Sequence, residues 1–285
     1  MITSMEPVSI TNAADPRIAD YVGLSDPELR QRVEARDGFF IAEGALVVRT
    51  LLATRHRVRS VLVTPKQRAA LADVLDDLAA PVYVVAPDVM RETVGFDLHR
   101  GAVAAADRFE LPKIEAVLEG AGLHGAGPAR VSRVAVLERV NDHENLGALF
   151  RNAAAFGVDA VLLCPECSDP LYRRSVRVST GHVLTLPWTR ATPWPAAIDT
   201  LKRHGFAVLA LTPAADATPI DSVVAGPDDR VAMLLGAEGP GLSAGALRLA
   251  TRRVRIPMAT GVDSLNVAVA AGIAFARCAP AGRLR

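Results

Sequence analysis

The 285-residue chain has few cysteines, few lysines and few aromatic side chains, and each shortage narrows the class of protein. Its 3 cysteines cannot form an even disulfide framework, and the first residues carry neither a basic segment nor an apolar stretch that would direct secretion. No run approaches the ~18 uncharged apolar residues that a membrane-spanning helix needs. We therefore expect a cytoplasmic protein in a reducing compartment, with no membrane partner.

The net charge of the chain is only +1, and nearly all of its positive charge is arginine. Such a small net charge does not by itself predict a nucleic-acid partner. Local arginine clusters suit phosphate, because the guanidinium fork binds it through two hydrogen bonds, but each cluster is equally consistent with ordinary solvated surface. Three clusters qualify, at residues 55–59, 173–177 and 252–255.

The order of apolar segments predicts two α/β domains. Over residues 1–110 we predict strands at 39–41, 58–64, 82–85 and 102–106. Helices are predicted at 16–36, between the first two strands as far as residue 52, at 65–79 and at 87–93. Asp26 and Pro27 are expected to begin a helix. The glycine-rich residues 111–131 are interpreted as a linker. The second domain, 132–285, is predicted to have strands near 132–138, 159–163, 206–211, 230–235 and 254–256.

A polar loop and an amphipathic helix follow the first strand of the second domain. From Leu146 onward, apolar residues recur at the spacing of one buried helical stripe. Asn145 is predicted as the N-cap of this helix and Gly157 as its C-cap. Arg151 lies near the N-terminal end of the helix, where the helix dipole does not favour a cation, so we interpret it as a candidate functional residue.

Two further loops follow short apolar strands near the carboxyl terminus. Residues 231–235 end at the Gly/Pro-rich segment 236–242, as a buried strand does before a ligand-facing loop. Residues 254–256 are predicted as a second strand, and Ser264 precedes a long apolar helix. Because ligands of open α/β sheets bind beyond the carboxyl ends of the strands, these loops predict one pocket.

Together, the three segments resemble the SpoU/TrmH family of RNA ribose 2′-O-methyltransferases, within the SPOUT superfamily. The resemblance covers roughly residues 130–280. The matching residues are Asn145, Gly147, Arg151, Phe156 and Gly157, then Gly236, Glu238, Gly239, Gly241 and Leu242, and finally Ile256, Pro257, Met258, Ser264, Leu265 and Asn266. The resemblance implies a SPOUT α/β domain with a trefoil knot. More loosely, residues 40–44 and 98–101 resemble the L30e-like RNA substrate-binding domain that precedes many such domains.

The same resemblance implies an enzyme that transfers a methyl group from S-adenosylmethionine to a ribose 2′-hydroxyl of RNA. The implied catalytic residues are Arg151, Asn145, Glu238, Ser264 and Asn266, and the implied cofactor-binding residues are Thr212, Gly236, Ile256, Met258 and Leu265. A homodimer is implied, with the RNA site shared between subunits, and residues 267–275 are apolar all round, as a helix in such an interface would be. Because the first domain, residues 1–110, resembles the L30e-like module, we expect ribosomal RNA as the substrate. The alternatives are tRNA, or an inactive RNA-binding relative.

Two other motifs favour different chemistry but lack the residues to complete it. Cys164 and Cys167 have the spacing of half a zinc site, but no second pair exists, so we interpret them as thiols of a loop and expect no metal. The segment 236–241 has glycines spaced somewhat like a dinucleotide-binding loop, but it does not follow the first strand. His143 is interpreted as a solvated loop residue near the site.

Overall fold

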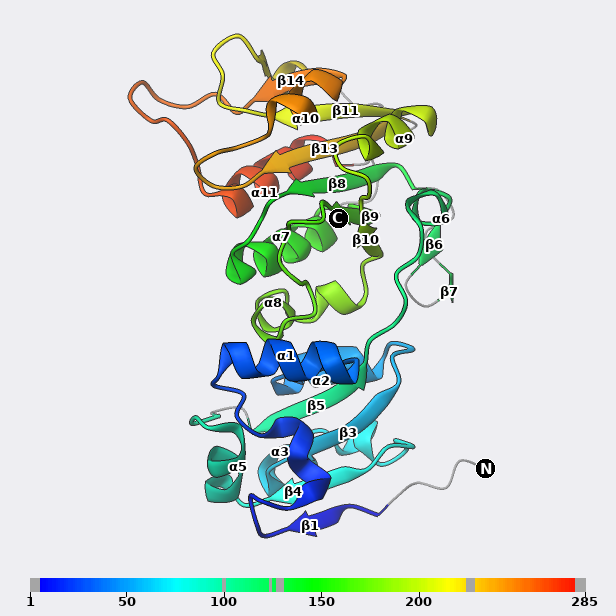
Figure 1. Cartoon of the computed structure of the whole chain (residues 1–285), viewed down its shortest axis with the longest axis vertical. Helices are drawn as coiled ribbons and strands as arrows, with labels where there is room; N and C mark the ends of the chain where they lie inside the picture. The colour runs from blue at the N-terminus through cyan, green and yellow to red at the C-terminus, as the bar shows by residue number, and fades with distance from the viewer. Residues whose placement is uncertain (1–5, 99–100, 123–124, 127–130, 224–228, 280–285) are drawn as a thin grey trace. The chain divides into compact units, whose positions relative to one another are not determined.

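The computed structural model describes residues 6–98, 101–122, 125–126, 131–223 and 229–279. The chain forms two compact units (Figure 1). The first unit comprises Met1–Glu110 and Leu171–Leu184, and the second comprises Leu111–Pro170 and Thr185–Arg285. In the described part of the chain, no helix has both the length and the apolar character needed to cross a membrane.

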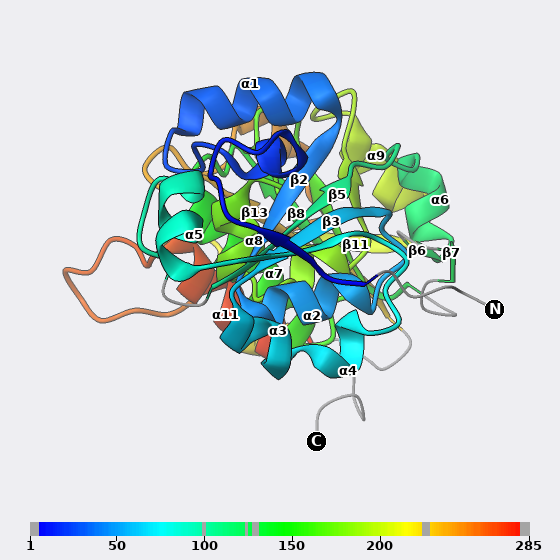
Figure 2. The ribbon, with the colours of Figure 1, turned by 90° about the horizontal axis from the view of Figure 1, so that it is seen from below.

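The first unit is built on a five-stranded mixed sheet in the order β1-β4-β3-β5-β2. β5 is antiparallel to both of its neighbours, and the other pairs are parallel. Figure 2 shows α1 on one face of this sheet and α2, α3 and α4 on the other. The strands are β1 Val8–Ile10, β2 Phe39–Glu43, β3 Val58–Val63, β4 Val82–Val85 and β5 Ala102–Asp107. The helices are η1 Pro16–Tyr21, α1 Pro27–Asp37, α2 Ala45–Leu52, α3 Pro65–Ala70, α4 Ala72–Leu75, α5 Pro87–Val94, α8 Arg173–Val178 and η2 His182–Leu184.

Two helices predicted as continuous are broken. The helix predicted at 16–36 is wrong, because the chain turns between η1 and α1 at Gly23, whose φ is 67°. The predicted start of α1 is confirmed: the Asp26 carboxylate accepts a hydrogen bond from the Leu29 N–H, and Pro27 is the first helical residue. The helix predicted at 65–79 is interrupted at Leu71, whose φ and ψ angles are not helical.

Helix α8 belongs to the first unit although its sequence lies far from the rest of that unit. Two of its three arginines bind the buried carboxylate of Glu43 at the end of β2: Arg173 forms an ion pair with it, and Arg177 Nη1 lies 3.2 Å from Oε1. Arg173 also donates to the Leu24 carbonyl at 2.9 Å. These contacts give two arginines of the 173–177 cluster a structural role inside the unit.

The second unit contains a seven-stranded parallel sheet in the order β10-β9-β8-β13-β11-β14-β12. Its strands are β8 Arg133–Glu138, β9 Ala160–Leu163, β10 Trp188–Arg190, β11 Phe206–Leu211, β12 Thr218–Pro219, β13 Arg230–Gly236 and β14 Arg252–Arg255. The strands predicted from sequence for this region are confirmed. The central strands β8, β9 and β13 are fully or almost fully buried, because a parallel sheet covered by helices is buried on both faces.

Helices cover both faces of this sheet. Alternate residues of β8 and β13, such as Val134 and Leu234, pack in one core with α6 Ile114–Leu118, α9 Ala197–Arg203 and α10 Ala244–Leu249. Figure 1 shows α7 His143–Ala155 and α11 Val267–Arg277 on the opposite face. The segment interpreted as a linker contributes α6 and the short strands β6 Ala121–Gly122 and β7 Gly125–Ala126, and its residues 123–124 and 127–130 lie outside the described residues. The knot implied by the resemblance stays a prediction.

Candidate active site

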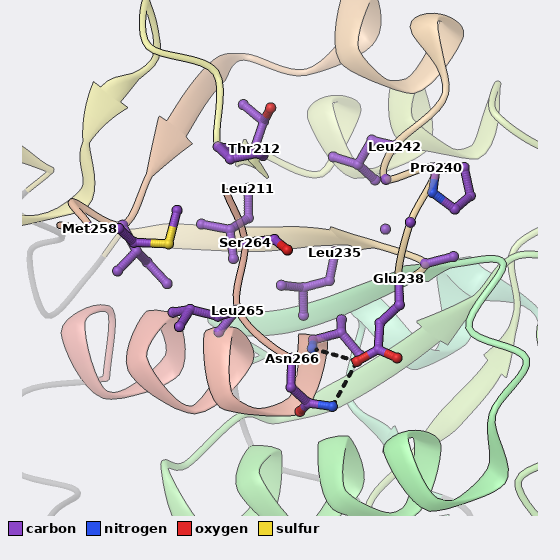
Figure 3. Close-up of a pocket in the computed structure, with 18 of the residues that line it drawn as sticks. Leu211, Thr212, Leu235, Glu238, Pro240, Leu242, Met258, Ser264, Leu265 and Asn266 are labelled. Carbon is purple, nitrogen blue, oxygen red and sulfur yellow. Dashed lines mark hydrogen bonds between the residues drawn. The ribbon is translucent and has the colours of Figure 1, made fainter. Parts of the chain in front are cut away.

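A cavity of about 660 Å³ opens in the second unit, where β11, β13 and β14 end. Its volume is typical of a site for a small molecule. Figure 3 shows apolar side chains such as Leu211, Leu235 and Leu265 between Thr212 and the polar pair Glu238–Asn266. The cavity is lined by residues 211–213, 235–242, 247, 256, 258, 264–267 and 270. The single pocket predicted from the strand-end loops is therefore present in the structure.

The loop after β13 folds tightly back on its own first residue. A Cβ on Gly236 would lie 2.4 Å from the Gly241 carbonyl carbon and 2.5 Å from the Leu242 nitrogen, so no larger residue fits there. The Gly241 N–H donates to the Ala237 carbonyl at 3.1 Å, and Gly241 has a φ of 64°. This fold turns the backbone of the loop toward the cavity.

A polar network joins the loop to α11 and α7. The Asn266 side-chain Nδ2 donates to Glu238 Oε1 at 2.7 Å and to Asn145 Oδ1 at 2.8 Å. The Asn266 Oδ1 accepts from the backbone of Ala268 and Val269, so Asn266 is also the N-cap of α11. The Glu238 carboxylate, which also accepts from the Val267 N–H, therefore lies at a helix N-terminus, where the dipole favours an anion (Figure 3).

The cap predicted for α7 is wrong, and the correction explains how Asn145 enters this network. The helix begins at His143, and the Asp142 carboxylate caps it by accepting from the Asn145 N–H at 2.7 Å. A carboxylate three residues before that N–H satisfies it, so the Asn145 side chain remains available to accept from Asn266. At the other end Phe156 is the C-cap, and Gly157, with a φ of 69°, follows it.

The structure brings most of the predicted site residues together and leaves Arg151 apart. Every predicted cofactor-binding residue lines the cavity, as do Glu238, Ser264 and Asn266, and Asn145 joins them through Asn266. Arg151 lies in the second half of α7, so the prediction that it lies near the N-terminal end of the helix is wrong. Its side chain is exposed and does not line the cavity, and no residue in the described part of the chain binds its guanidinium. The described residues therefore give Arg151 no structural role.

The other arginine clusters are partly occupied by carboxylates. Arg59 forms a short ion pair with Asp107, which also lies 3.0 Å from the Arg57 guanidinium. Arg253 pairs with Asp216 at 2.7 Å. The Arg57 side chain is 87% exposed, so its pair is weak and leaves it free to meet phosphate.

The two loop cysteines form a close thiol pair. Cys164 Sγ lies 3.7 Å from Cys167 Sγ, and the Arg190 guanidinium binds the backbone carbonyls of both residues. The hydrogen bond with Cys167 and that from the Arg139 N–H lower the pKa of the Cys164 thiol, whereas the pKa of Cys167 is raised. Among the described residues, no group of three or more potential metal ligands was found.

A buried carboxylate, Glu138, lies behind the cavity wall and was not predicted from the sequence. Glu138, at the end of β8, is buried, and its carboxylate accepts from the Trp194 indole and from the Ser243 N–H, each at 2.7 Å. The only signal in the sequence was a charged residue at the end of an apolar strand, which is equally typical of a solvated loop.

Comparisons with known proteins agree with this architecture. The model of the SpoU rRNA Methylase family matches residues 132–276. An uncharacterized tRNA/rRNA methyltransferase of Mycobacterium tuberculosis is 47% identical over 262 residues, which cover 92% of this chain and 88% of the relative.

Two solved structures are similar over nearly the whole chain. The AdoMet-bound rRNA methyltransferase from Sinorhizobium meliloti has a TM-score of 0.76 and 25% identity, over 95% of this chain and 96% of its own. An RNA 2′-O ribose methyltransferase has a TM-score of 0.73 and 28% identity, over 95% of this chain and 98% of its own.

Proposed function

The chain belongs to the SpoU rRNA methylase family of RNA methyltransferases, and from this premise we propose that it transfers a methyl group from S-adenosylmethionine to a ribose 2′-hydroxyl of RNA. The observation that carries the proposal is the cavity, whose wall contains Glu238, Ser264 and Asn266 from two separate loops. A relative of similar fold is bound to AdoMet, and another is a ribose 2′-O-methyltransferase.

The cavity suits S-adenosylmethionine in shape and chemistry. The loop folded back on Gly236 offers backbone polar groups, while Leu211, Ile256 and Met258 supply apolar wall. The cofactor would supply an already activated methyl group, so the chain itself must position the ribose and help to remove a weakly acidic proton.

We assign charge stabilisation to Arg151. A guanidinium keeps its proton in proteins, so Arg151 cannot serve as the base. Its charge can instead stabilise the developing alkoxide and hold an RNA phosphate, with the proton leaving to phosphate or water.

We propose a homodimer in which Arg151 of one subunit lies beside the cavity of the other. The resemblance implies an RNA site shared between subunits, which fits an Arg151 that is exposed and outside the cavity. Exposed apolar side chains at the start of α11 and just before it, Val269 at 53% and Leu265 at 36%, are consistent with a covered surface there.

We propose ribosomal RNA as the substrate, and tRNA is the alternative. In the first unit, which resembles the L30e-like module, Arg57 and Arg59 are paired with Asp107, so RNA recognition there would depend on shape more than on net charge.

Calorimetry followed by methylation assays tests the proposal. We expect S-adenosylmethionine to bind with micromolar affinity, about −8 kcal/mol. Ribosomal RNA transcripts should then acquire tritium from labelled cofactor at a position that becomes resistant to alkaline hydrolysis. Absence of binding at millimolar cofactor contradicts the function, and methylation of tRNA alone contradicts the substrate.

A further inference from the structure

Glu138 has a buried carboxylate that does not line the cavity but binds the loop that does. Glu138 is 2% exposed, and in the sheet it pairs with Gly236, where the cavity loop begins. Oε2 accepts from the N–H of Ser243, the residue at which the loop ends and α10 begins. One side chain therefore fixes the end of a loop whose start lies beside it in the sheet.

The next residue, Arg139, binds the same loop two residues before Ser243. Arg139 Nη2 donates to the Gly241 carbonyl at 3.3 Å. Arg139 has a φ of 55°, which non-glycine residues rarely adopt. The side chains of two consecutive residues, Glu138 and Arg139, therefore bind the same loop.

We propose that Glu138 and Arg139 are positioning residues for the cavity loop, and that they set the affinity for S-adenosylmethionine through Ser243 and Gly241; this inference rests on the proposed function. A carboxylate is required at position 138 because two N–H donors, of Trp194 and of Ser243, face its two oxygens. A glutamine has one acceptor oxygen, so its NH₂ group would face a donor and one hydrogen bond would be lost.

Asp159 provides a matched control for the burial of a carboxylate. It is 6% exposed, and it accepts from the N–H groups of Ser132 and Arg133 at 2.7 and 2.8 Å. It lies in the same unit at the opposite end of β8, away from the cavity loop. Asp159→Asn should therefore lower the melting temperature without moving the cofactor affinity.

The test compares Glu138→Gln with Asp159→Asn in the full chain by two measurements. Calorimetry should show S-adenosylmethionine binding at least tenfold more weakly in Glu138→Gln and within about twofold of wild type in Asp159→Asn. Hydrogen exchange of the cofactor-free protein should show faster exchange of the Ser243 amide in Glu138→Gln alone. Equal affinities in the two variants, or an unchanged Ser243 amide, overturn the proposal.

A double variant distinguishes positioning from general damage. Trp194→Phe removes one donor and keeps the aromatic ring, so in the Glu138→Gln/Trp194→Phe variant the glutamine oxygen can again accept from Ser243. Its affinity should return to within about threefold of wild type. A double variant as weak as Glu138→Gln contradicts the inference.

Arg139→Ala keeps the proposal testable if Glu138→Gln does not fold. Arg139 is only partly buried, so its truncation disturbs the interior less than a change at the fully buried Glu138. We expect a several-fold weaker affinity in Arg139→Ala and an unchanged affinity in Trp194→Phe, and the reverse pattern refutes the assignment. If the wild type binds no cofactor, the proposed function fails, while the Ser243 exchange measurement still tests the contact itself.

Discussion

At the scale of single residues, the role proposed for Arg151 predicts a variant that loses methylation and keeps cofactor binding. Because its guanidinium lies outside the cavity, Arg151→Ala should leave S-adenosylmethionine affinity unchanged. Loss of one preorganised charge at a developing oxyanion costs about 10²–10³ in rate, so methylation should fall by that factor. Single-turnover methylation with saturating cofactor measures this, and Arg151→Lys tests whether charge alone suffices. A near wild-type rate in Arg151→Ala would remove it from the mechanism.

Tyr21 gives the first unit a predicted sensitivity to alkaline pH. Burial raises the pKa of its phenol well above the ordinary value near 10, and its hydroxyl lies 2.7 Å from Ser60 Oγ. Above about pH 10 the unfolded chain loses this proton while the folded chain keeps it. The stabilising contribution is therefore complete below pH 10 and is lost as the pH rises further, by up to ~1.4 kcal/mol per pH unit.

Urea unfolding between pH 9 and 11 (roughly one unit on either side of the ordinary tyrosine pKa) measures this slope. Tyr21→Phe is the control, because it removes the titrating proton and keeps the ring. We expect the variant to show a shallower loss of stability over this range. Identical slopes in the two proteins would refute the assignment.

At the scale of elements, the strands of the second unit were predictable and the ends of its helices were not. Buried parallel strands are short apolar runs, so β8, β11 and β13 stand out in the sequence. Helix ends depend on which of several nearby polar side chains reaches a free N–H, and Asp142 does so where Asn145 was expected. The cavity loops were predictable because their glycines and prolines follow strand ends.

Because Asp142 and not Asn145 caps α7, substitutions of these two residues should have opposite effects. Asp142→Ala removes the cap and should lower the free energy of unfolding by about 1 kcal/mol. Asn145→Ala removes no cap, but it deletes the acceptor 2.8 Å from Asn266 Nδ2 and should impair methylation at nearly unchanged stability. Chemical denaturation and initial rates check both, and a larger loss of stability in Asn145→Ala would restore the original cap assignment.

At the scale of the whole molecule, the sequence could not show which segments fold together. Leu171–Leu184 belongs to the first unit because Arg173 and Arg177 meet the buried Glu43, a pairing across more than a hundred residues that no local pattern reveals. A truncation at residue 110 would therefore strip α8 of the residues it packs on. Point variants in the full chain are therefore the better way to measure what each unit contributes. The role of Glu138 was hidden for the same reason, since Trp194 and Ser243 are distant in sequence.

The proposed dimer predicts that two inactive variants restore each other. Gly236→Ala places a methyl group against the Gly241 backbone and should disable the cavity, whereas Arg151→Ala leaves the cavity intact and lacks the charge. If each site combines the cavity of one subunit with Arg151 of the other, a mixed dimer contains one complete site. Half of the dimers in an equimolar, re-equilibrated mixture are mixed, so the mixture should recover about a quarter of wild-type activity.

Each variant alone, incubated in the same way, is the control and should stay inactive. Sedimentation of the full chain should independently give a dimer, and Val269→Asp, which puts a charge on the exposed apolar side of α11, should weaken it. A dimer whose mixture stays inactive would place Arg151 and the cavity of the same subunit in one site. A monomeric wild-type chain with full activity would exclude the shared site altogether, because Arg151 would then have to reach the ribose within a single chain.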